Sequence, residues 1–250
     1  MYTKVKTAEE IESMRVAGKM LATVLQYVKN HAVKGMSTKD LADLAAKELK
    51  RLGGAPSFLG YHGFPDVLCV SVNDEVVHGI PSVNKILENG DIVSIDFGVT
   101  YKGMVTDAAL TFVIGDVDPK VQKLIDTTER SLMAGIDALK SGIRVGDIAS
   151  SVQKVLDTGC YGIVRDLVGH GVGHELHEDP NIPNYGHAGS GPVLQAGMTI
   201  AIEPMATLGT HKVKQDNDGW TIRTADGSLS AHFEHTILIT EKGYEILTQV

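Results

Sequence analysis

Two strand patterns with a carboxylate inside each constrain the fold of this chain most strongly. In GDIVSIDFGVTYKGMVTDAALTFVIG (residues 90–115), apolar residues recur at the period of two that is typical of strands, and the strands carry Asp96 and Asp107. A hairpin turning at Tyr101-Lys102 would place these aspartates directly opposite each other, with Cβ atoms roughly 5 Å apart. Because buried carboxylates repel unless a cation intervenes, the hairpin predicts either a metal site or an aspartate pair at an exposed sheet end.

The second half of the chain repeats this arrangement with glutamates. Two apolar-alternating segments between residues 197 and 240 carry one glutamate each, Glu203 and Glu234. A pairing that places them opposite each other is centred on Asp218-Gly219, and Asp-Gly is the strongest short hairpin signal. Two such hairpins would bring four carboxylates toward one centre, which is difficult to explain as surface decoration.

Glycines recur between the halves at matching positions. Gly35 precedes Asp96 by as many residues as Gly142 precedes Glu203. Gly90 and Gly197 likewise precede the same two carboxylates by an equal, shorter number of residues. We therefore expect one structural unit that is used twice along the chain. Its halves would cover about residues 8–115 and 118–240 of a single domain, residues 1–250.

Helix signals precede each hairpin. Thr7-Ala-Glu-Glu has the capping-box form, Ser37-Thr38 can cap a second helix, and Asp118-Pro119 can open a third. The expected helices cover about residues 8–30, 39–51, 119–140 and 148–158. This order, helix–helix–hairpin used twice, predicts an α+β fold with helices layered on one side of a curved antiparallel sheet. We expect the glycine-rich residues 168–191 to form a loop.

Composition excludes several classes of protein. The 250 residues are 43% hydrophobic and 22% charged, which is ordinary for a globular protein, and the net charge of −8 argues against a general nucleic-acid binder. The two cysteines, Cys69 and Cys160, show no paired metal spacing and indicate a reducing compartment. The chain shows neither a signal peptide nor an apolar run near ~18 residues, so we expect a cytoplasmic protein that binds no membrane.

Common catalytic motifs are absent from the sequence. HELH at residues 174–177 lacks the spacing of HExxH, and neither GxGxxG, GxxxxGK[ST] nor GxSxG occurs. What remains is a set of carboxylates with histidines, of which a single histidine is more often structural than a ligand. Carboxylates with one imidazole suit a pair of divalent ions such as Mn²⁺, Fe²⁺, Co²⁺ or Zn²⁺, which can lower the pKa of a shared water.

Five segments together resemble the short, single-domain methionine aminopeptidases, members of the pita-bread metallopeptidase family. They are VVHGIP (76–81), IDFGVTYKGMVTDAALTF (95–112), VGHGVGHELHEDP (168–180), IAIEPM (200–205) and SAHFEHTILIT (230–240). The resemblance covers nearly the whole chain. It implies a pita-bread fold with a pseudo-two-fold axis and the removal of N-terminal methionine from nascent polypeptides whose second residue is small.

The resemblance also implies roles for individual residues. Asp96 would chelate one of two divalent metal ions, Asp107 and Glu234 would bridge both, and His170 and Glu203 would bind the other. Glu203 would also take a proton from the nucleophilic water. The non-ligand histidines His78 and His177 would contact substrate or polarise the reacting carbonyl, as imidazole N–H groups can.

A methionine pocket is implied as well. Its matching positions here are Tyr61, Phe64, Cys69, Leu176 and Trp220. Relatives often carry an aromatic residue where this chain has Leu176. Ordinary core packing is the alternative for Cys69 and Phe64, and it is favoured for Cys69 taken alone. Trp220, just after the Asp-Gly turn, fits the rim of an active site better.

Other readings of the sequence remain open. Proline-specific aminopeptidases and dipeptidases share the metal set, but they usually carry a large additional N-terminal domain. Metal-free creatine hydrolysis and a non-enzymatic translation-associated role are disfavoured by the complete set of ligands. We expect a monomer, with the ribosome as a further partner to test.

Overall fold

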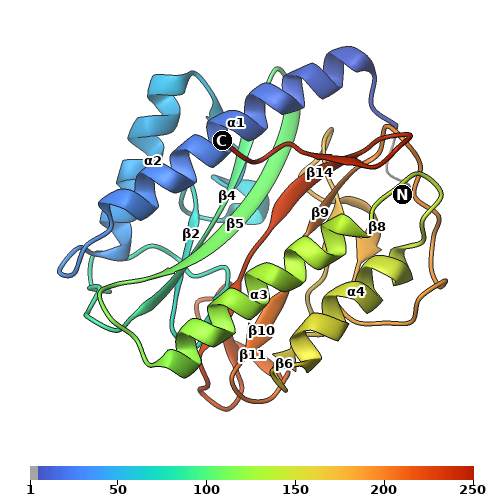
Figure 1. Cartoon of the computed structure of the whole chain (residues 1–250). Helices are drawn as coiled ribbons and strands as arrows, with labels where there is room; N and C mark the ends of the chain where they lie inside the picture. Colours follow the sequence, from blue (N-terminus) through green and yellow to red (C-terminus); the bar gives the residue numbers. More distant parts are fainter. Residues whose placement is uncertain (1–4) are drawn as a thin grey trace.

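The computed structural model describes residues 5–250, which form helices packed on antiparallel strands (Figure 1). The helices are α1 (Ala8–His31), α2 (Thr38–Leu52), α3 (Pro119–Asp137) and α4 (Val145–Asp157), with the 3₁₀ turn η1 (Tyr61–Gly63). The strands are β1 (Ala55–Pro56), β2 (Cys69–Val72), β3 (Glu75–Val77), β4 (Ile92–Tyr101), β5 (Met104–Val113), β6 (Gly162–Ile163), β7 (Gly169–Gly171), β8 (Glu178–Ile182), β9 (Thr199–Ile202), β10 (Met205–Thr207), β11 (Val213–Gln215), β12 (Ile222–Thr224), β13 (Ser230–His232), β14 (His235–Ile239) and β15 (Tyr244–Ile246).

Local side-chain bonds define the ends of the first two helices, as predicted. The Thr7 hydroxyl accepts from the Glu10 N–H, and the Glu10 carboxylate accepts from the Thr7 N–H at 2.7 Å. Ser37 and Asp40 form the same capping box on α2, which ends at Gly53 in the left-handed region. The later helices differ modestly from prediction, since α3 ends at Asp137 and α4 already begins at Val145.

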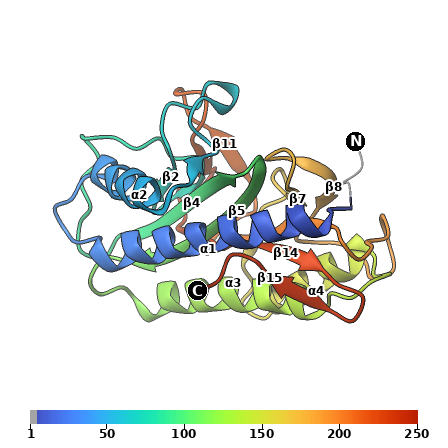
Figure 2. The same ribbon diagram turned by 90° about the horizontal axis from the view of Figure 1, so that it is seen from above.

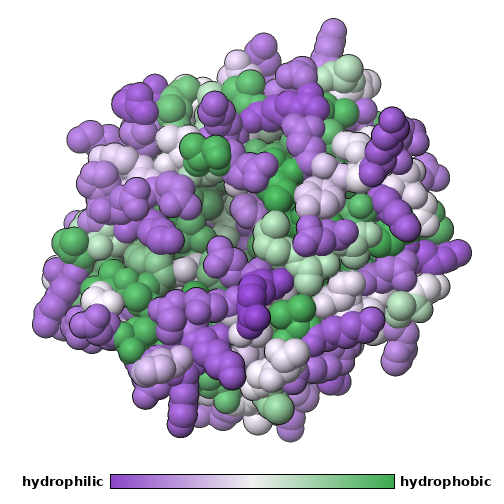
Figure 3. All heavy atoms as spheres, viewed as in Figure 1, coloured by the Kyte–Doolittle hydropathy of each residue, from purple (hydrophilic) through white to green (hydrophobic). Residues whose placement is uncertain are grey.

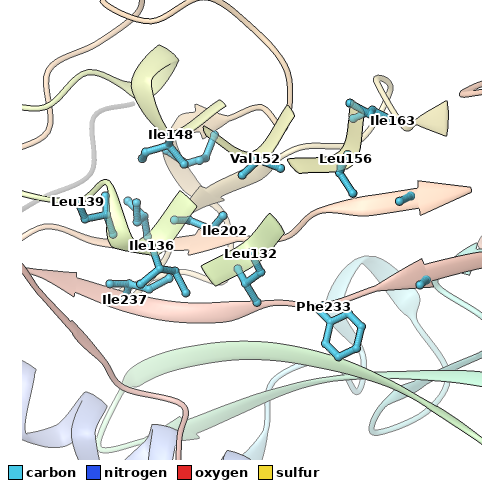
Figure 4. Close-up of a cluster of buried hydrophobic side chains, with 14 of the residues drawn as sticks. Leu132, Ile136, Leu139, Ile148, Val152, Leu156, Ile163, Ile202, Phe233 and Ile237 are labelled. Carbon is cyan, nitrogen blue, oxygen red and sulfur yellow. The ribbon is translucent and has the colours of Figure 1, made fainter. Parts of the chain in front are cut away.

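Each half of the chain has its own hydrophobic core. Helices α1 and α2 pack on β2, β4 and β5, whereas α3 and α4 pack on strands of the second half. Figure 4 shows Leu132 and Ile136 of α3 and Ile148, Val152 and Leu156 of α4 against Ile202 and Ile237 of β9 and β14. In Figure 2, α1 and α3 run alongside each other over the strands.

The outer face of these helices is polar. Figure 3 shows mostly hydrophilic side chains on this face, with apolar ones between them rather than in one unbroken patch. No helix within residues 5–250 combines the length and the apolar character needed to cross a membrane.

The predicted single curved sheet is divided. Every strand pair in the described chain is antiparallel, but the strands fall into four hydrogen-bonded groups. Their orders are β1-β4-β2 with β5 on β4, β13-β10-β6, β11-β12-β3, and β15-β14-β9-β7-β8. Between β5 and the second half, side chains replace some of the backbone pairs, as described below.

The predicted register of the first hairpin is wrong. The turn lies at Lys102-Gly103, both with positive φ (48° and 81°), so Asp96 faces Ala109 and Asp107 faces Gly98. A two-residue turn of this kind favours glycine at its second position, which Tyr101-Lys102 does not offer. Asp96 and Asp107 are therefore diagonal neighbours on one face instead of direct partners.

The predicted register of the second hairpin is confirmed. Ile202 pairs with His235 and Met205 with His232, so Glu203 and Glu234 lie opposite each other in the gap between these pairs. Strands β11 and β12 continue the same register around Asp218-Gly219. The loop is longer than a two-residue turn, because the pairing closes between Asp216 and Thr221 (N–O 2.8 Å).

The repeat of one unit in the two halves is visible in backbone hydrogen bonds. The Gly35 N–H donates to the Leu87 carbonyl at 2.8 Å, and the Gly142 N–H donates to the Leu194 carbonyl at 2.9 Å. Both glycines have positive φ (90° and 87°), which explains why glycine recurs there. The chain enters the second helix of each half through the same turn.

The two halves meet along β5. At the centre of this line, Ala109 and Glu234 exchange two backbone hydrogen bonds of 2.9 and 3.3 Å. These two residues are equivalent positions of the two hairpins, and the second hairpin is the longer of the two. Elsewhere, β3 of the first half pairs with β12 of the second. Along β5, the contacts on either side of the Ala109–Glu234 pair are made by side chains.

Two threonine hydroxyls supply these contacts, one from each half. On one side the Thr236 hydroxyl bridges to the backbone of Asp107, accepting at 2.8 Å and donating at 2.7 Å. On the other side the Thr111 hydroxyl bridges in the same way to His232, at 2.9 and 2.6 Å. The matching pattern is what a pseudo-two-fold axis between the halves requires.

The glycine-rich segment is not a loop throughout, which corrects the prediction for residues 168–191. Strand β7 pairs with β8 and β9, and it places His170 opposite Ala201. Glycine is required at Gly169 because a Cβ there would lie 2.3 Å from the Ala201 carbonyl oxygen. Because glycine weakens the apolar pattern, the sequence signal for this strand was lost.

Candidate metal centre and active site

A cavity of about 260 Å³ brings the predicted site residues together. Its walls come from both halves of the chain, from the loop around η1 to the segment between β13 and β14. All twelve predicted residues line it, with two that were not predicted: Phe58, Tyr61, His62, Phe64, Cys69, His78, Asp96, Asp107, His170, Leu176, His177, Glu203, Trp220 and Glu234.

Four carboxylates and one imidazole form the polar end of this cavity. Asp96, Asp107, Glu234 and His170 are between 2% and 9% exposed. His170 Nε2 lies 3.5 Å from Glu203 Oε1 and 4.0 Å from Asp107 Oδ2. One ligand atom each from Asp107, His170 and Glu234 lie within 4.8 Å of one another, so these residues could hold a metal ion.

Burial makes this cluster electrostatically unfavourable without a cation. Burial raises the pKa of Asp107 to about 7, and burial together with neighbouring carboxylates raises the pKa values of Asp96 and Glu234 well above their usual range. Burial and the Asp107 charge also raise the pKa of Glu203. One oxygen each of Asp96, Asp107 and Glu234 has no hydrogen-bond partner within residues 5–250. Unpaired buried oxygens on adjacent carboxylates fit divalent cations, whose binding would displace the protons.

His170 presents the correct nitrogen for a metal ligand. Its Nδ1 lies 2.8 Å from the Gly171 carbonyl oxygen, which can only accept, so Nδ1 carries the proton. Nε2 is left as an acceptor facing Glu203 and Asp107. Burial lowers the pKa of His170 to about 3, so the ring is neutral.

The two other predicted histidines also line the cavity, and the His177 ring lies beside the His170 ring with centroids 4.3 Å apart. His177 is exposed at its mouth, and its Nδ1 is 2.8 Å from the Tyr61 hydroxyl. His78 is half-buried with φ 60°, and its ring lies edge-on to Trp220 at 6.4 Å. Burial lowers the pKa of both histidines, that of His78 to about 4, so both are neutral near pH 7.

Aromatic and apolar side chains form the remaining wall. Phe64 packs edge-on against Trp220 with ring centroids 5.1 Å apart, and Phe58 packs against Phe64 at 6.5 Å. Cys69 is paired with Asp96 in the ladder, and its buried thiol has a raised pKa. Phe64 and Cys69 line the cavity and also belong to a buried cluster that contains Leu176.

The model of metallopeptidase family M24 matches residues 12–241. This chain belongs to metallopeptidase family M24. It is 47% identical to a methionine aminopeptidase of Clostridium acetobutylicum over 244 residues, which is 98% of each chain. It is 46% identical to methionine aminopeptidase 1 of Bacillus subtilis, again over 98% of each chain.

Solved structures of the M24 family show the same fold. The crystal structure of methionine aminopeptidase from Thermotoga maritima has a TM-score of 0.98 and 48% identity, covering 99% of this chain and 100% of that one. Prolidase from Pyrococcus furiosus has a TM-score of 0.78 and 26% identity, and 65% of that chain is covered. The predicted pita-bread fold is thereby confirmed.

Sequence reasoning missed several residues of this M24 site. Phe58 packs against Gly98, where a Cβ would lie 2.7 Å from the Phe58 ring, and His62 lines the cavity beside Tyr61. Asn184 donates from Nδ2 to the Glu203 carbonyl at 3.0 Å. His232 is buried with Nε2 3.9 Å from Glu203 Oε2. Only His232 had a sequence signal, because it shares a strand face with Glu234 two positions later.

Proposed function

We propose that this chain removes the N-terminal methionine from nascent polypeptides and peptides whose second residue is small. The observation that carries the proposal is one cavity that is lined both by a carboxylate–imidazole cluster and by aromatic, thiol and apolar side chains. At about 260 Å³, the cavity is smaller than the ~300–1,000 Å³ typical of sites for drug-sized ligands, which suits one amino-acid side chain. Similarity to methionine aminopeptidases over 98% of both chains supports the same function.

Two divalent ions, of Co, Mn, Fe or Zn, are proposed for the polar end. Asp96 would chelate one, Asp107 and Glu234 would bridge both, and His170 and Glu203 would hold the other. The charges of two such ions would balance those of the four carboxylates, which removes the cost of burying them. When bound, the ions supply Lewis-acid chemistry and lower the pKa of water.

The protein's own residues would do the rest. Glu203, facing the centre through Oε1, would accept the proton of the attacking water and return it to the leaving amine. Burial and nearby carboxylates raise the pKa of Tyr61, so its hydroxyl keeps its proton and donates to His177 Nδ1. This bond leaves the proton of the neutral His177 ring on Nε2, where it can be donated to the developing carbonyl oxyanion.

The methionine side chain would lie against the apolar wall. Phe64, Cys69, Leu176 and Trp220 line the cavity, and a linear thioether packs well against aromatic edges. His78 would contact the substrate as a neutral donor. Its left-handed backbone, at φ 60°, points to a position under functional constraint.

Wider features of the protein belong to the same proposal. Residues 1–250 would act as one catalytic domain with halves of about 8–115 and 118–240, working as a monomer in the cytoplasm. The unpaired Cys69 and Cys160 support a reducing compartment. Nascent chains would be met near the ribosome, and we expect no role in nucleic-acid or membrane binding.

The alternative function is proline-specific peptide cleavage. Prolidase shares the fold, but it is only 26% identical to this chain, which covers 65% of that protein. A direct test compares hydrolysis of Met-Ala-Ser, Met-Leu-Ser, Ala-Ala-Ser and Ala-Pro peptides by the same metal-loaded protein. Clear preference for Met-Ala-Ser supports the proposal, whereas equal turnover of the Xaa-Pro and Met-Ala peptides would overturn it.

A further inference from the structure

His232 is a buried ionisable side chain for which the proposed mechanism has no role. It is 1% exposed, and neither ring nitrogen has a hydrogen-bond partner among residues 5–250. Leaving both polar atoms of a buried imidazole unpaired is unfavourable, so such a group calls for a partner. It lies on β13 two positions before Glu234, on the same strand face.

The symmetry of the two halves assigns His232 a specific place in the centre. Thr111 bridges to the backbone of His232 as Thr236 bridges to the backbone of Asp107, with Glu234 paired to β5 between them. His232 is thus the counterpart of Asp107. Each projects toward the centre from one side of the line where the halves meet.

The carboxylate of Glu203 lies close to this imidazole. The backbone of Glu203 is held at its carbonyl by Asn184 Nδ2 (3.0 Å), which leaves the carboxylate to be oriented by its own neighbours. Oε1 lies 3.5 Å from His170 Nε2, and Oε2 lies 3.9 Å from His232 Nε2. Glu203 is therefore flanked by two imidazoles, one at each oxygen.

We propose that His232 is a positioning residue that donates from Nε2 to Oε2 of Glu203 and keeps Oε1 directed at the centre. The separation of 3.9 Å must shorten by about 1 Å for a hydrogen bond, and such bonds are often long before substrate binds. A carboxylate held in this way keeps the orientation it needs both as a ligand and as a proton acceptor. The inference rests on the proposed function of Glu203.

The test compares two substitutions of His232 in the full chain. His232→Leu removes the donor at similar apolar volume, and His232→Gln keeps an N–H donor on a flexible side chain. His235→Leu is the matched control, because His235 is a neighbouring strand histidine whose Nδ1 contacts Thr248 Oγ1 instead of Glu203. Each protein is assayed for Met-Ala-Ser hydrolysis, Mn²⁺ binding by calorimetry and thermal unfolding.

The proposal predicts that His232→Leu lowers kcat about 10-fold or more with KM within about twofold, and weakens Mn²⁺ binding about 10-fold without changing its stoichiometry. His232→Gln should recover to within about threefold of wild type, and His235→Leu should keep wild-type kcat. A His232→Leu protein with normal kcat and Mn²⁺ affinity would overturn the proposal. Equal losses in the Leu and Gln variants would also overturn it, because His232 would then have a structural role. The loss of a bound ion would overturn it as well, because His232 would then be a metal ligand.

The two failures can be told apart. If the wild-type protein does not cleave Met-Ala-Ser, the proposed function fails, while Mn²⁺ affinities still report whether His232 orients Glu203. If the wild-type protein cleaves the peptide but the three variants behave alike, only the role of His232 is wrong.

Discussion

The Thr236 hydroxyl joins the two halves of the molecule at Asp107: it accepts from the Asp107 N–H at 2.8 Å and donates to the Asp107 carbonyl at 2.7 Å. One side chain thereby satisfies both backbone groups of a residue whose carboxylate lies in the centre of the site. The strands diverge at this point, so no backbone pair could do the same.

Thr236→Val should therefore weaken metal binding. Valine keeps the shape of threonine but leaves the Asp107 N–H and carbonyl unpaired, at a cost of about 1–3 kcal/mol in the free energy of unfolding. Loss of such support typically lowers metal affinity about 10–100-fold. Calorimetric titration with Mn²⁺ measures this change. Thr236→Ser, which keeps the hydroxyl, should bind close to normally, and equal binding by the Val variant would contradict the role.

The catalytic role of His177 predicts a selective loss of kcat. His177→Ala should lower kcat on the order of 10²–10³-fold with a smaller change in KM, since its hydrogen bond forms mainly in the transition state. Tyr61→Phe should have a smaller effect in the same direction, because it removes only the hydrogen bond that fixes the tautomer of His177. Both constants and the melting temperature are measured on each variant. A destabilised His177→Ala protein with near-normal kcat would end the catalytic assignment.

The close packing of Phe58 on Gly98 predicts that a larger residue at position 98 impairs the methionine pocket. A Cβ at Gly98 would lie 2.7 Å from the Phe58 ring and 3.0 Å from Ser57 Cβ, so Gly98→Ala should push Phe58 into the cavity. Overpacking of this kind costs about 1–3 kcal/mol, and we expect it mainly as a raised KM for Met-Ala-Ser. Gly243→Ala is the control, because no atom lies within 4 Å of a Cβ there. An unchanged KM in Gly98→Ala would show that Phe58 does not shape the pocket.

Protonation of the carboxylates predicts how stability depends on pH. The folded-state pKa of Asp107 is raised to about 7, so the unfolded chain ionises at lower pH than the folded one. Metal-free protein should lose stability as the pH rises from about 4 through 7, as Asp107 ionises in the folded state. Urea unfolding in EDTA at pH 5, 6 and 7.5 measures it, and Mn²⁺ should abolish the decline. Equal stability of the EDTA-treated protein at pH 5 and 7.5 would contradict this account.

Local signals in the sequence predicted much of this architecture. The caps at Thr7 and Ser37 and the register of Glu203 with Glu234 follow from a few neighbouring residues and an alternating pattern. The repeated glycine spacing predicted one unit used twice, and equivalent turns open at Gly35 and Gly142. Such features depend on interactions close in sequence or on direct repetition.

Other features depend on contacts that the sequence pattern does not contain. The first hairpin turns at Lys102-Gly103 because backbone φ, not the symmetry of the carboxylates, determines the turn. Phe58 lines the cavity only because the chain near β1 crosses Gly98. The importance of Thr236 and His232 becomes visible once the halves meet, and a single strand pattern cannot show which residue lies across that line.

A metal titration coupled to activity tests the central claim most directly. The protein is stripped with a chelator, and divalent ions are returned in steps while bound metal and Met-Ala-Ser hydrolysis are measured on the same samples. Stripped protein should be inactive, and activity should return with bound metal, up to two ions per chain and with methionine as the released residue. Full activity of the stripped protein, or binding that saturates without restoring methionine release, would contradict the account.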